Sequence, residues 1–124
     1  MSSLKFSFLL VISIFFTSCS KDDLELLEDG IWKLQDVKWD NISNINDCNK
    51  DDKMNFSSSK VFFNIGVVKC SENDKNREST YTLLSDQKIL VIGNSRRNIT
   101  LLTETRLTLS STTLLGEFSS EYTK

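Results

Sequence analysis

The sequence predicts an all-β domain, and more specifically a small eight-stranded antiparallel barrel whose strands run up and down. Two observations support this fold. Between Gly30 and Lys124, apolar residues alternate with polar ones in short segments, a period of two that is typical of strands with one buried face. Short stretches rich in Asn, Asp, Ser and Gly separate the segments, and hairpin connections of this kind make neighbouring strands antiparallel.

Eight segments carry the alternation in turn. Residues 60–70 are the longest and have apolar side chains at every second position, while residues 88–92 form an almost continuous apolar run. Turn sequences such as Gly93-Asn94 divide the later segments. In chain order, the predicted strands are residues 31–39, 53–57, 60–70, 78–84, 88–92, 98–103, 106–110 and 114–122.

A row of hairpin-connected strands must close on itself or leave its edges exposed. An up-and-down barrel is the most economical closure, and a two-sheet β-sandwich of the same strands is the alternative. The chain contains no proline, so no segment is excluded from the hydrogen-bond ladder on that ground. Before the first strand, a short helical turn carries Leu24, Leu26 and Leu27, which could plug one end of a barrel.

The first eighteen residues have a different character. Lys5 is followed by an apolar run at residues 6–16 and then by Thr17-Ser18. As a helix this run would span roughly 16 Å, too short for a hydrocarbon core of about 30 Å. A basic start, a short apolar run and small residues predict an export signal rather than a permanent membrane span.

Phe16-Thr17-Ser18-Cys19 resembles the lipobox of bacterial lipoproteins, with Phe16 where leucine is usual. The resemblance implies cleavage before Cys19, diacylglycerol on the cysteine sulfur and an acyl chain such as palmitate on the new amine. These covalent lipids are the only attached groups we expect, and no further cofactor is predicted. Two or more acyl chains anchor a protein stably to a membrane. The alternative is an ordinary secretory signal, with Cys19 kept as a thiol.

The residues after Cys19 bear on location. Ser20-Lys21-Asp22-Asp23 resembles the surface-export signal of Bacteroidetes lipoproteins, which implies an outer-membrane protein that faces the cell exterior. A solvated acidic tether on the periplasmic face is the alternative. We therefore divide the chain into a signal peptide (1–18), a lipidated cysteine with acidic tether and helical turn (19–29), and a barrel domain (30–124).

Lipidation of Cys19 would leave Cys48 and Cys70 as a pair. In an oxidising compartment we expect a disulfide between them, which would add about 3 kcal/mol to the stability in the chain-entropy model. Two unlinked thiols are the alternative. A structural zinc site is not expected, because the chain has no histidine and only these two thiols.

Gly30-Ile31-Trp32, at the start of the first strand, resembles the Gly-x-Trp motif of lipocalins. In that family the tryptophan packs across the closed end of the barrel, and an arginine of the last strand often covers it. The last predicted strand here has no arginine, so Arg106, one strand earlier, is the candidate substitute.

The wider layout resembles the lipocalin-like lipoproteins of Bacteroidetes. Their pattern is a lipidated cysteine, a tether, a strand with tryptophan, and then Cys-x-x-Asp-Asp before a short strand with an aromatic residue. Here Cys48 to Asp52 match that motif and Phe56 follows. The resemblance spans nearly the whole chain after Cys19, through short motifs.

The composition argues against catalysis and metal binding. No histidine is present, which removes the commonest general base and metal ligand, and no Gly-x-Ser-x-Gly elbow occurs. Asp47, Asn49 and Asp51 begin like a calcium loop. However, Asp52 stands where that loop needs glycine, and Ser58 where it needs glutamate. We expect no enzyme and no dedicated metal site.

The charge argues against nucleic acid as a partner. The net charge of −2 becomes −3 once Lys5 is removed with the signal peptide, and Arg96-Arg97 is the densest basic point. A nucleic-acid-binding domain would show a basic stripe or patch instead.

Two functions remain. The first is a carrier of a small apolar ligand inside the barrel, and the candidate lining residues are Trp39, Phe56, Phe63, Ile65, Tyr81, Leu101 and Phe118. The second is a surface module that contacts a protein or glycan through loops 40–52 and 71–77. An eight-stranded barrel is wide enough either to be filled by side chains or to hold one small ligand, and at this size we expect filling.

Overall fold

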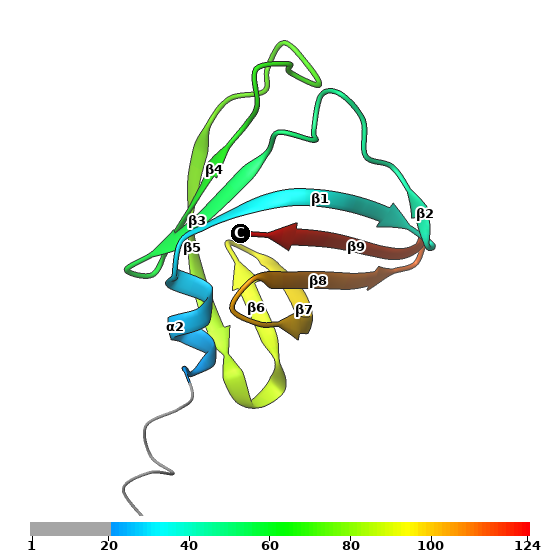
Figure 1. Cartoon of the computed structure of the whole chain (residues 1–124). Helices are drawn as coiled ribbons and strands as arrows, with labels where there is room; N and C mark the ends of the chain where they lie inside the picture. The colour runs from blue at the N-terminus through cyan, green and yellow to red at the C-terminus, as the bar shows by residue number, and fades with distance from the viewer. Residues whose placement is uncertain (1–20) are drawn as a thin grey trace, which may run out of the picture.

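The computed structural model describes residues 21–124, so the predicted signal peptide and Cys19 lie outside the described residues (Figure 1). Helix α2 spans Asp23–Glu28 and is followed by strands that occupy most of the chain. The strands are β1 (Ile31–Trp39), β2 (Ile42–Ser43), β3 (Lys53–Ser57), β4 (Lys60–Asn64), β5 (Arg77–Leu84), β6 (Ile89–Ile92), β7 (Ser95–Leu102), β8 (Arg106–Thr113) and β9 (Gly116–Thr123), with a short 3₁₀ helix, η1 (Ser85–Gln87), between β5 and β6.

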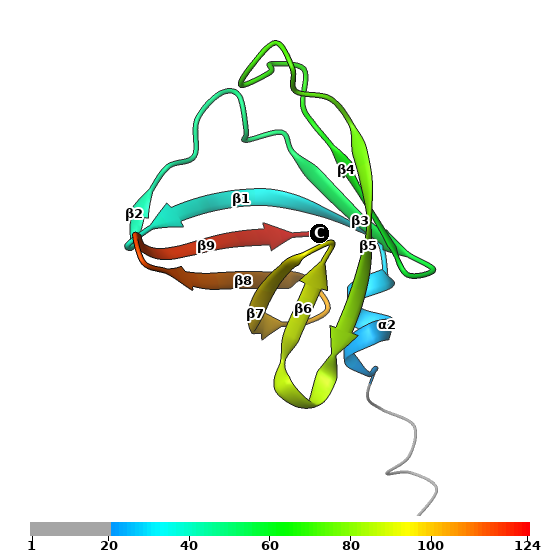
Figure 2. The ribbon, with the colours of Figure 1, turned by 180° about the vertical axis from the view of Figure 1, so that it is seen from behind.

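The strands form a closed antiparallel barrel, as predicted. Apart from β2, each strand pairs with the next in chain order, and β1 also pairs with β9, which closes the sheet. A single sheet that closes on itself leaves no place for the alternative of two packed sheets. The additional strand β2 folds back on the end of β1. Figure 2 shows the barrel from behind, with β6 and β7 between β5 and β8.

Helix α2 covers one end of the barrel. Asp22 caps it, because its carboxylate accepts a hydrogen bond from the Glu25 amide at 2.8 Å. The helix ends before Gly30, whose φ of +95° turns the chain into β1. Of the three leucines predicted to plug the barrel, only Leu27 is fully buried; Leu26 is half-buried and Leu24 is exposed.

The core fills the barrel from the α2 end upward. Ten buried side chains contact one another there: Leu27, Trp32, Met54, Phe56, Val61, Tyr81, Leu90, Ile99, Leu107 and Leu109. Leu27 comes from α2, and the other nine come from inward positions of β1 and of β3 to β8, since inward positions alternate with outward ones along each strand. Full burial of each large aliphatic or aromatic side chain contributes roughly 1.5–3 kcal/mol. We call this the closed end, and the opposite end the open end.

Two loops rise over the open end, residues 44–52 and residues 65–76, and we call them the mouth loops (Figure 1). The predicted disulfide between Cys48 and Cys70 is confirmed and joins them, with the two Cα atoms 4.9 Å apart. The loops also approach closely beside the disulfide, since a side chain at Gly66 would collide with that of Asp51.

Three strand boundaries differ from the prediction by three residues or more. Strand β4 ends at Asn64 rather than at residue 70, because the chain leaves the ladder there to form the second mouth loop. Strand β7 begins at Ser95 rather than at residue 98, directly after the Gly93-Asn94 turn. Strand β8 runs on to Thr113, so the last hairpin turns at residues 114–115.

Candidate ligand-binding site

The open end of the barrel holds a cavity. Its main part has a volume of about 510 Å³, and a neighbouring part of about 350 Å³ shares Met54, Phe63, Arg77, Arg97 and Tyr122 with it. Met54 and Leu109 belong to both the core and the cavity lining, so they form its floor. Volumes of this size lie within the range of about 300–1,000 Å³ that small-molecule sites occupy. The expectation that side chains fill the whole barrel therefore holds only for the closed end.

Apolar side chains form much of the wall. Leu34 and Val37 of β1, Phe63 of β4 and Phe118 of β9 all line the main part. Phe118 packs against Trp39, its cross-strand partner. The two ring centroids lie 5.9 Å apart in an edge-to-face arrangement. The wall thus offers a surface that can hold an apolar group.

Two arginines lie against this wall, Arg97 half-buried and Arg77 exposed at the rim. Arg97 is the cross-strand partner of Leu90, which is fully buried, so Arg97 also points to the interior. Its guanidinium lies 5.5 Å from the centroid of Phe118. Arg77, the first residue of β5, lies 4.8 Å over the ring of Phe63. Both arginines line both parts of the cavity.

Neither arginine has an anionic partner within residues 21–124. All five ion pairs of this segment use a lysine, and no side-chain hydrogen bond within it involves Arg77 or Arg97. The two guanidinium groups therefore keep their hydrogen-bond donors available to whatever occupies the cavity.

Three carboxylates reach the cavity edge. Glu78 pairs with Lys60 at 3.7 Å, and the other two are engaged with the mouth loops. The Asp74 carboxylate accepts hydrogen bonds from the amides of Cys70 at 2.8 Å and Ser71 at 3.0 Å. The Asp52 carboxylate accepts one from the Gly66 amide at 3.3 Å. Burial raises the pKa of Asp52, and the charges of Asp74 and Asp51 add to the shift.

Tyr122 adds a neutral polar group. It follows Phe118 and Ser120 at alternate positions of β9, and all three line the cavity. Burial raises the pKa of its phenol, against the weaker opposing effects of a hydrogen bond with Ser120 and the charge of Arg97. The hydroxyl thus stays protonated at neutral pH and can donate a hydrogen bond.

The residues predicted to line a cavity fall into three groups. Phe63, Ile65 and Phe118 line it, and Trp39 supports Phe118. Phe56 and Tyr81 instead fill the closed end, packed edge to face with centroids 5.0 Å apart.

Leu101 does not face the interior as predicted. It is 37% exposed on the outer surface. A β-bulge in β7 between Ile99 and Leu101 shifts the alternation, so that Leu102 packs against the core in its place.

Sequence reasoning missed the two arginines as part of the site. Arg96 and Arg97 look like one basic point in the sequence, but as neighbours in a strand they face opposite sides of the sheet. Extending the alternation of Ile99 backward by two residues would have placed Arg97 inside.

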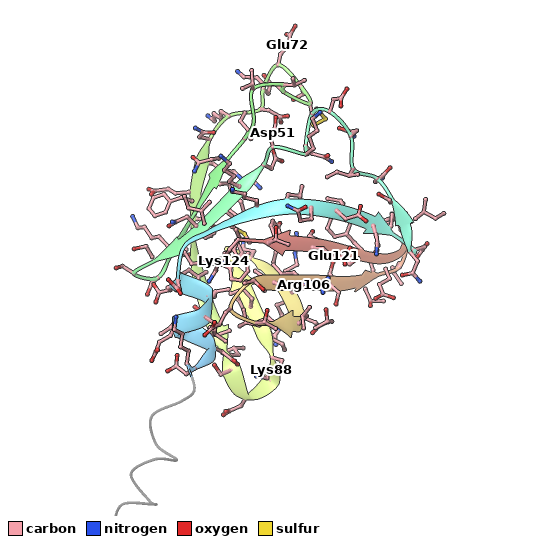
Figure 3. All side chains as sticks on the ribbon, viewed as in Figure 1. Asp51, Glu72, Lys88, Arg106, Glu121 and Lys124 are labelled. Atoms are coloured by element: carbon pink, nitrogen blue, oxygen red, sulfur yellow. A yellow bond between two sulfur atoms is a disulfide. The ribbon has the colours of Figure 1, made fainter. Side chains whose placement is uncertain are left out.

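At the closed end, Trp32 is fully buried, and its indole N–H donates a hydrogen bond to the Leu27 carbonyl at 2.9 Å. The cation over its ring is Lys124, not Arg106. The Lys124 Nζ lies 4.3 Å from the ring centroid and donates to the Leu26 carbonyl at 3.1 Å. Figure 3 labels both basic residues and shows Lys124 where α2 meets β1. Lys124 follows β9 directly, and the exposed Arg106 begins β8.

Searches among protein families, curated proteins and solved structures found no match to this chain. Within residues 21–124, no three Asp, Glu or Cys side chains gather as a metal site would require. In the same segment, no helix is long and apolar enough to cross a membrane.

Proposed function

We propose that this protein is a non-enzymatic lipoprotein of the cell envelope that carries a small apolar ligand in the open end of a lipocalin-like barrel. The observation that carries the proposal is the cavity of about 510 Å³, whose lining includes Phe63, Phe118 and aliphatic side chains among polar ones. A barrel that served only as a rigid mount would gain stability by filling this space with apolar side chains, because the apolar surface removed from water would increase.

The lipid anchor proposed on Cys19 would place the open end away from the membrane. Cys19 lies three residues before Asp22, the cap of α2, and three residues of chain reach about 10 Å at most. Since α2 covers the closed end, an anchored barrel would turn that end towards the membrane (Figure 1). The cavity would then open towards the medium, and for an outer-membrane protein exported to the surface that medium is the cell exterior.

The proposal is tested by native mass spectrometry of the protein purified from its own host. We expect a co-purifying small apolar molecule, with one copy per chain. Intact mass should also show that the chain begins at Cys19 and carries diacylglycerol and an acyl chain. A chain that still carries residues 1–18, or an unmodified Cys19, would refute the anchor. A ligand-free barrel that takes up no apolar probe would refute the carrier.

One observation favours a second function, that of a surface module contacting a protein or glycan. Large apolar side chains are exposed around the open end, with Ile42 72%, Val67 94% and Leu115 83% exposed. Ile42 falls in one of the loops predicted as contact surfaces, and the other two lie outside them. A stoichiometric protein partner in the same mass spectrum, with an empty cavity, would support this function over the carrier.

A further inference from the structure

We infer that the ligand is an amphipathic anion, with an apolar body held by the cavity wall and an anionic head group paired with Arg97 and Arg77. This inference deepens the proposed carrier function and rests on it. It depends on four observations: the direction of Arg97, the lack of partners for both arginines, the aromatic rings beneath them, and the state of the nearby carboxylates.

Arg97 is placed inside the barrel by strand register. Leu90, opposite it on β6, is fully buried, while its neighbour Arg96 lies opposite Val91 on the other face of the sheet. An arginine in a half-buried, apolar-walled position loses part of its hydration, and a bound counter-charge compensates for that loss. Within residues 21–124 no carboxylate forms an ion pair with Arg97. A bound ligand would therefore supply the counter-charge.

Each guanidinium group is held in place at the cavity by contact with an aromatic ring. Arg97 lies over Phe118 and Arg77 over Phe63, and the negative face of an aromatic ring attracts a cation placed over it. Within residues 21–124 the N–H groups of both arginines donate to no side chain and form no ion pair. The N–H edge of a guanidinium is the part that binds a carboxylate, sulfate or phosphate group.

The acidic groups at the cavity edge pair with neither arginine, because each is engaged elsewhere; Glu78 forms its ion pair with Lys60 at 3.7 Å. Asp74 and Asp52 accept hydrogen bonds from amides of the mouth loop at residues 65–76. Burial also raises the pKa of Asp52 above its ordinary value. Tyr122 contributes a neutral hydroxyl donor rather than a competing anion. An anionic head group therefore meets two arginines without anionic partners and a hydroxyl donor, with Lys53 and Lys75 also in the lining.

The test uses residues 21–124 as a soluble domain, because the closed ladder, the core and the disulfide all lie within that segment. Binding of decanoate and of its neutral methyl ester, each below its aggregation limit, is measured by calorimetry. We expect decanoate to bind at least about tenfold more tightly, as one charge-assisted interaction allows. Raising the salt concentration should weaken decanoate binding and leave ester binding unchanged.

Arg97→Met and Arg96→Met form a matched pair of variants. Arg97→Met should lose about tenfold or more in affinity for decanoate and keep its affinity for the ester, while Arg96→Met should match the wild type in both. Arg77→Met, at the rim, provides a second variant with the same expected selectivity and little risk to folding.

The outcomes separate the two proposals. If the domain binds the ester as tightly as decanoate, or if Arg97→Met weakens both equally, the anion inference is wrong and the carrier function stands. If neither probe binds, both are wrong. A selective loss for decanoate alone in Arg97→Met supports both.

Discussion

The two ends of the barrel are built from the same strands in opposite ways. At the closed end, the polar groups are paired within the fold: the Trp32 indole donates to Leu27, and Lys124 donates to Leu26 while covering the indole ring. At the open end, Arg97 and Arg77 face a cavity and have no such partner within the described chain. Strand β9 takes part in both ends, from Phe118 at the cavity to Thr123 beside Lys124.

The difference shows where stability and recognition reside. The closed end gains its stability from buried apolar surface, whose contribution grows with the area removed from water. The mouth loops bury little such surface and are held by the Cys48–Cys70 bond instead. Binding surfaces are often loops mounted on a rigid scaffold, and here the scaffold is the closed end.

Trp32→Ala should produce the largest loss of stability. Truncation of a fully buried tryptophan costs about 3–5 kcal/mol, whereas Phe118→Ala, half-buried at the cavity, should cost less than half as much. Urea unfolding of the 21–124 domain measures both. Trp32→Phe is the control, because it keeps most of the volume and loses the hydrogen bond to Leu27. Equal losses for Trp32→Ala and Phe118→Ala would contradict the division between the ends.

Removing the disulfide should have the next largest effect. The double variant Cys48→Ser, Cys70→Ser should lower the free energy of unfolding by about 3 kcal/mol and weaken binding of the decanoate probe, because Cys48 and both mouth loops contribute to the cavity lining. Dithiothreitol should lower the stability and the probe affinity of the wild type, because it reduces the disulfide. It should change neither quantity in the double variant. Unchanged probe binding in the double variant would mean that the mouth loops do not shape the site.

Asp52→Asn should change the free energy of unfolding least. Unlike the variants above, it should raise it. The folded-state pKa of Asp52 is raised above its ordinary value of 3.8, first by burial. The folded state therefore favours the protonated form, and this group opposes folding increasingly as the pH rises above about 3.8 through the raised pKa.

The Asp52→Asn variant removes that opposition and still has an oxygen to accept the Gly66 amide. We expect it to be more stable than the wild type near pH 7, by less than about 1 kcal/mol after solvent screening, and to approach the wild type below pH 4. Urea unfolding across that pH range measures the difference. A variant that is less stable at pH 7 would show that the ionised carboxylate stabilises the fold.

Much of the fold could be predicted because its signals are local. Alternation identified all eight barrel strands, and Asn-, Asp- and Gly-rich turns separated them. Strand β2 was missed because it has only two residues and depends on a tight turn at Asp40 and Asn41, both with positive φ. The cysteine count predicted the Cys48–Cys70 bond.

The candidate site was predicted less well, because it depends on the phase of the alternation rather than on its period. A shift of one residue moves a side chain from one face of a strand to the other. The bulge in β7 moved Leu101 outside, and the earlier start of the same strand brought Arg97 inside. The bulge leaves no clear signal in the local sequence, whereas the position of Arg97 follows once the alternation of Ile99 is extended backward to the start of β7.

The sequence by itself thus determined the number of barrel strands, their antiparallel order and the cysteine pair, since these follow from residue periodicity, turn chemistry and a count. Only the tertiary structure decided the register, the pairing of β1 with β9 and the division into a filled and an open end. It also decided which cation covers Trp32, placing Lys124 there instead of Arg106. The physical reason is that these features arise from contacts between residues far apart in the chain, and a pattern of period two carries no information about which distant partner each residue will meet.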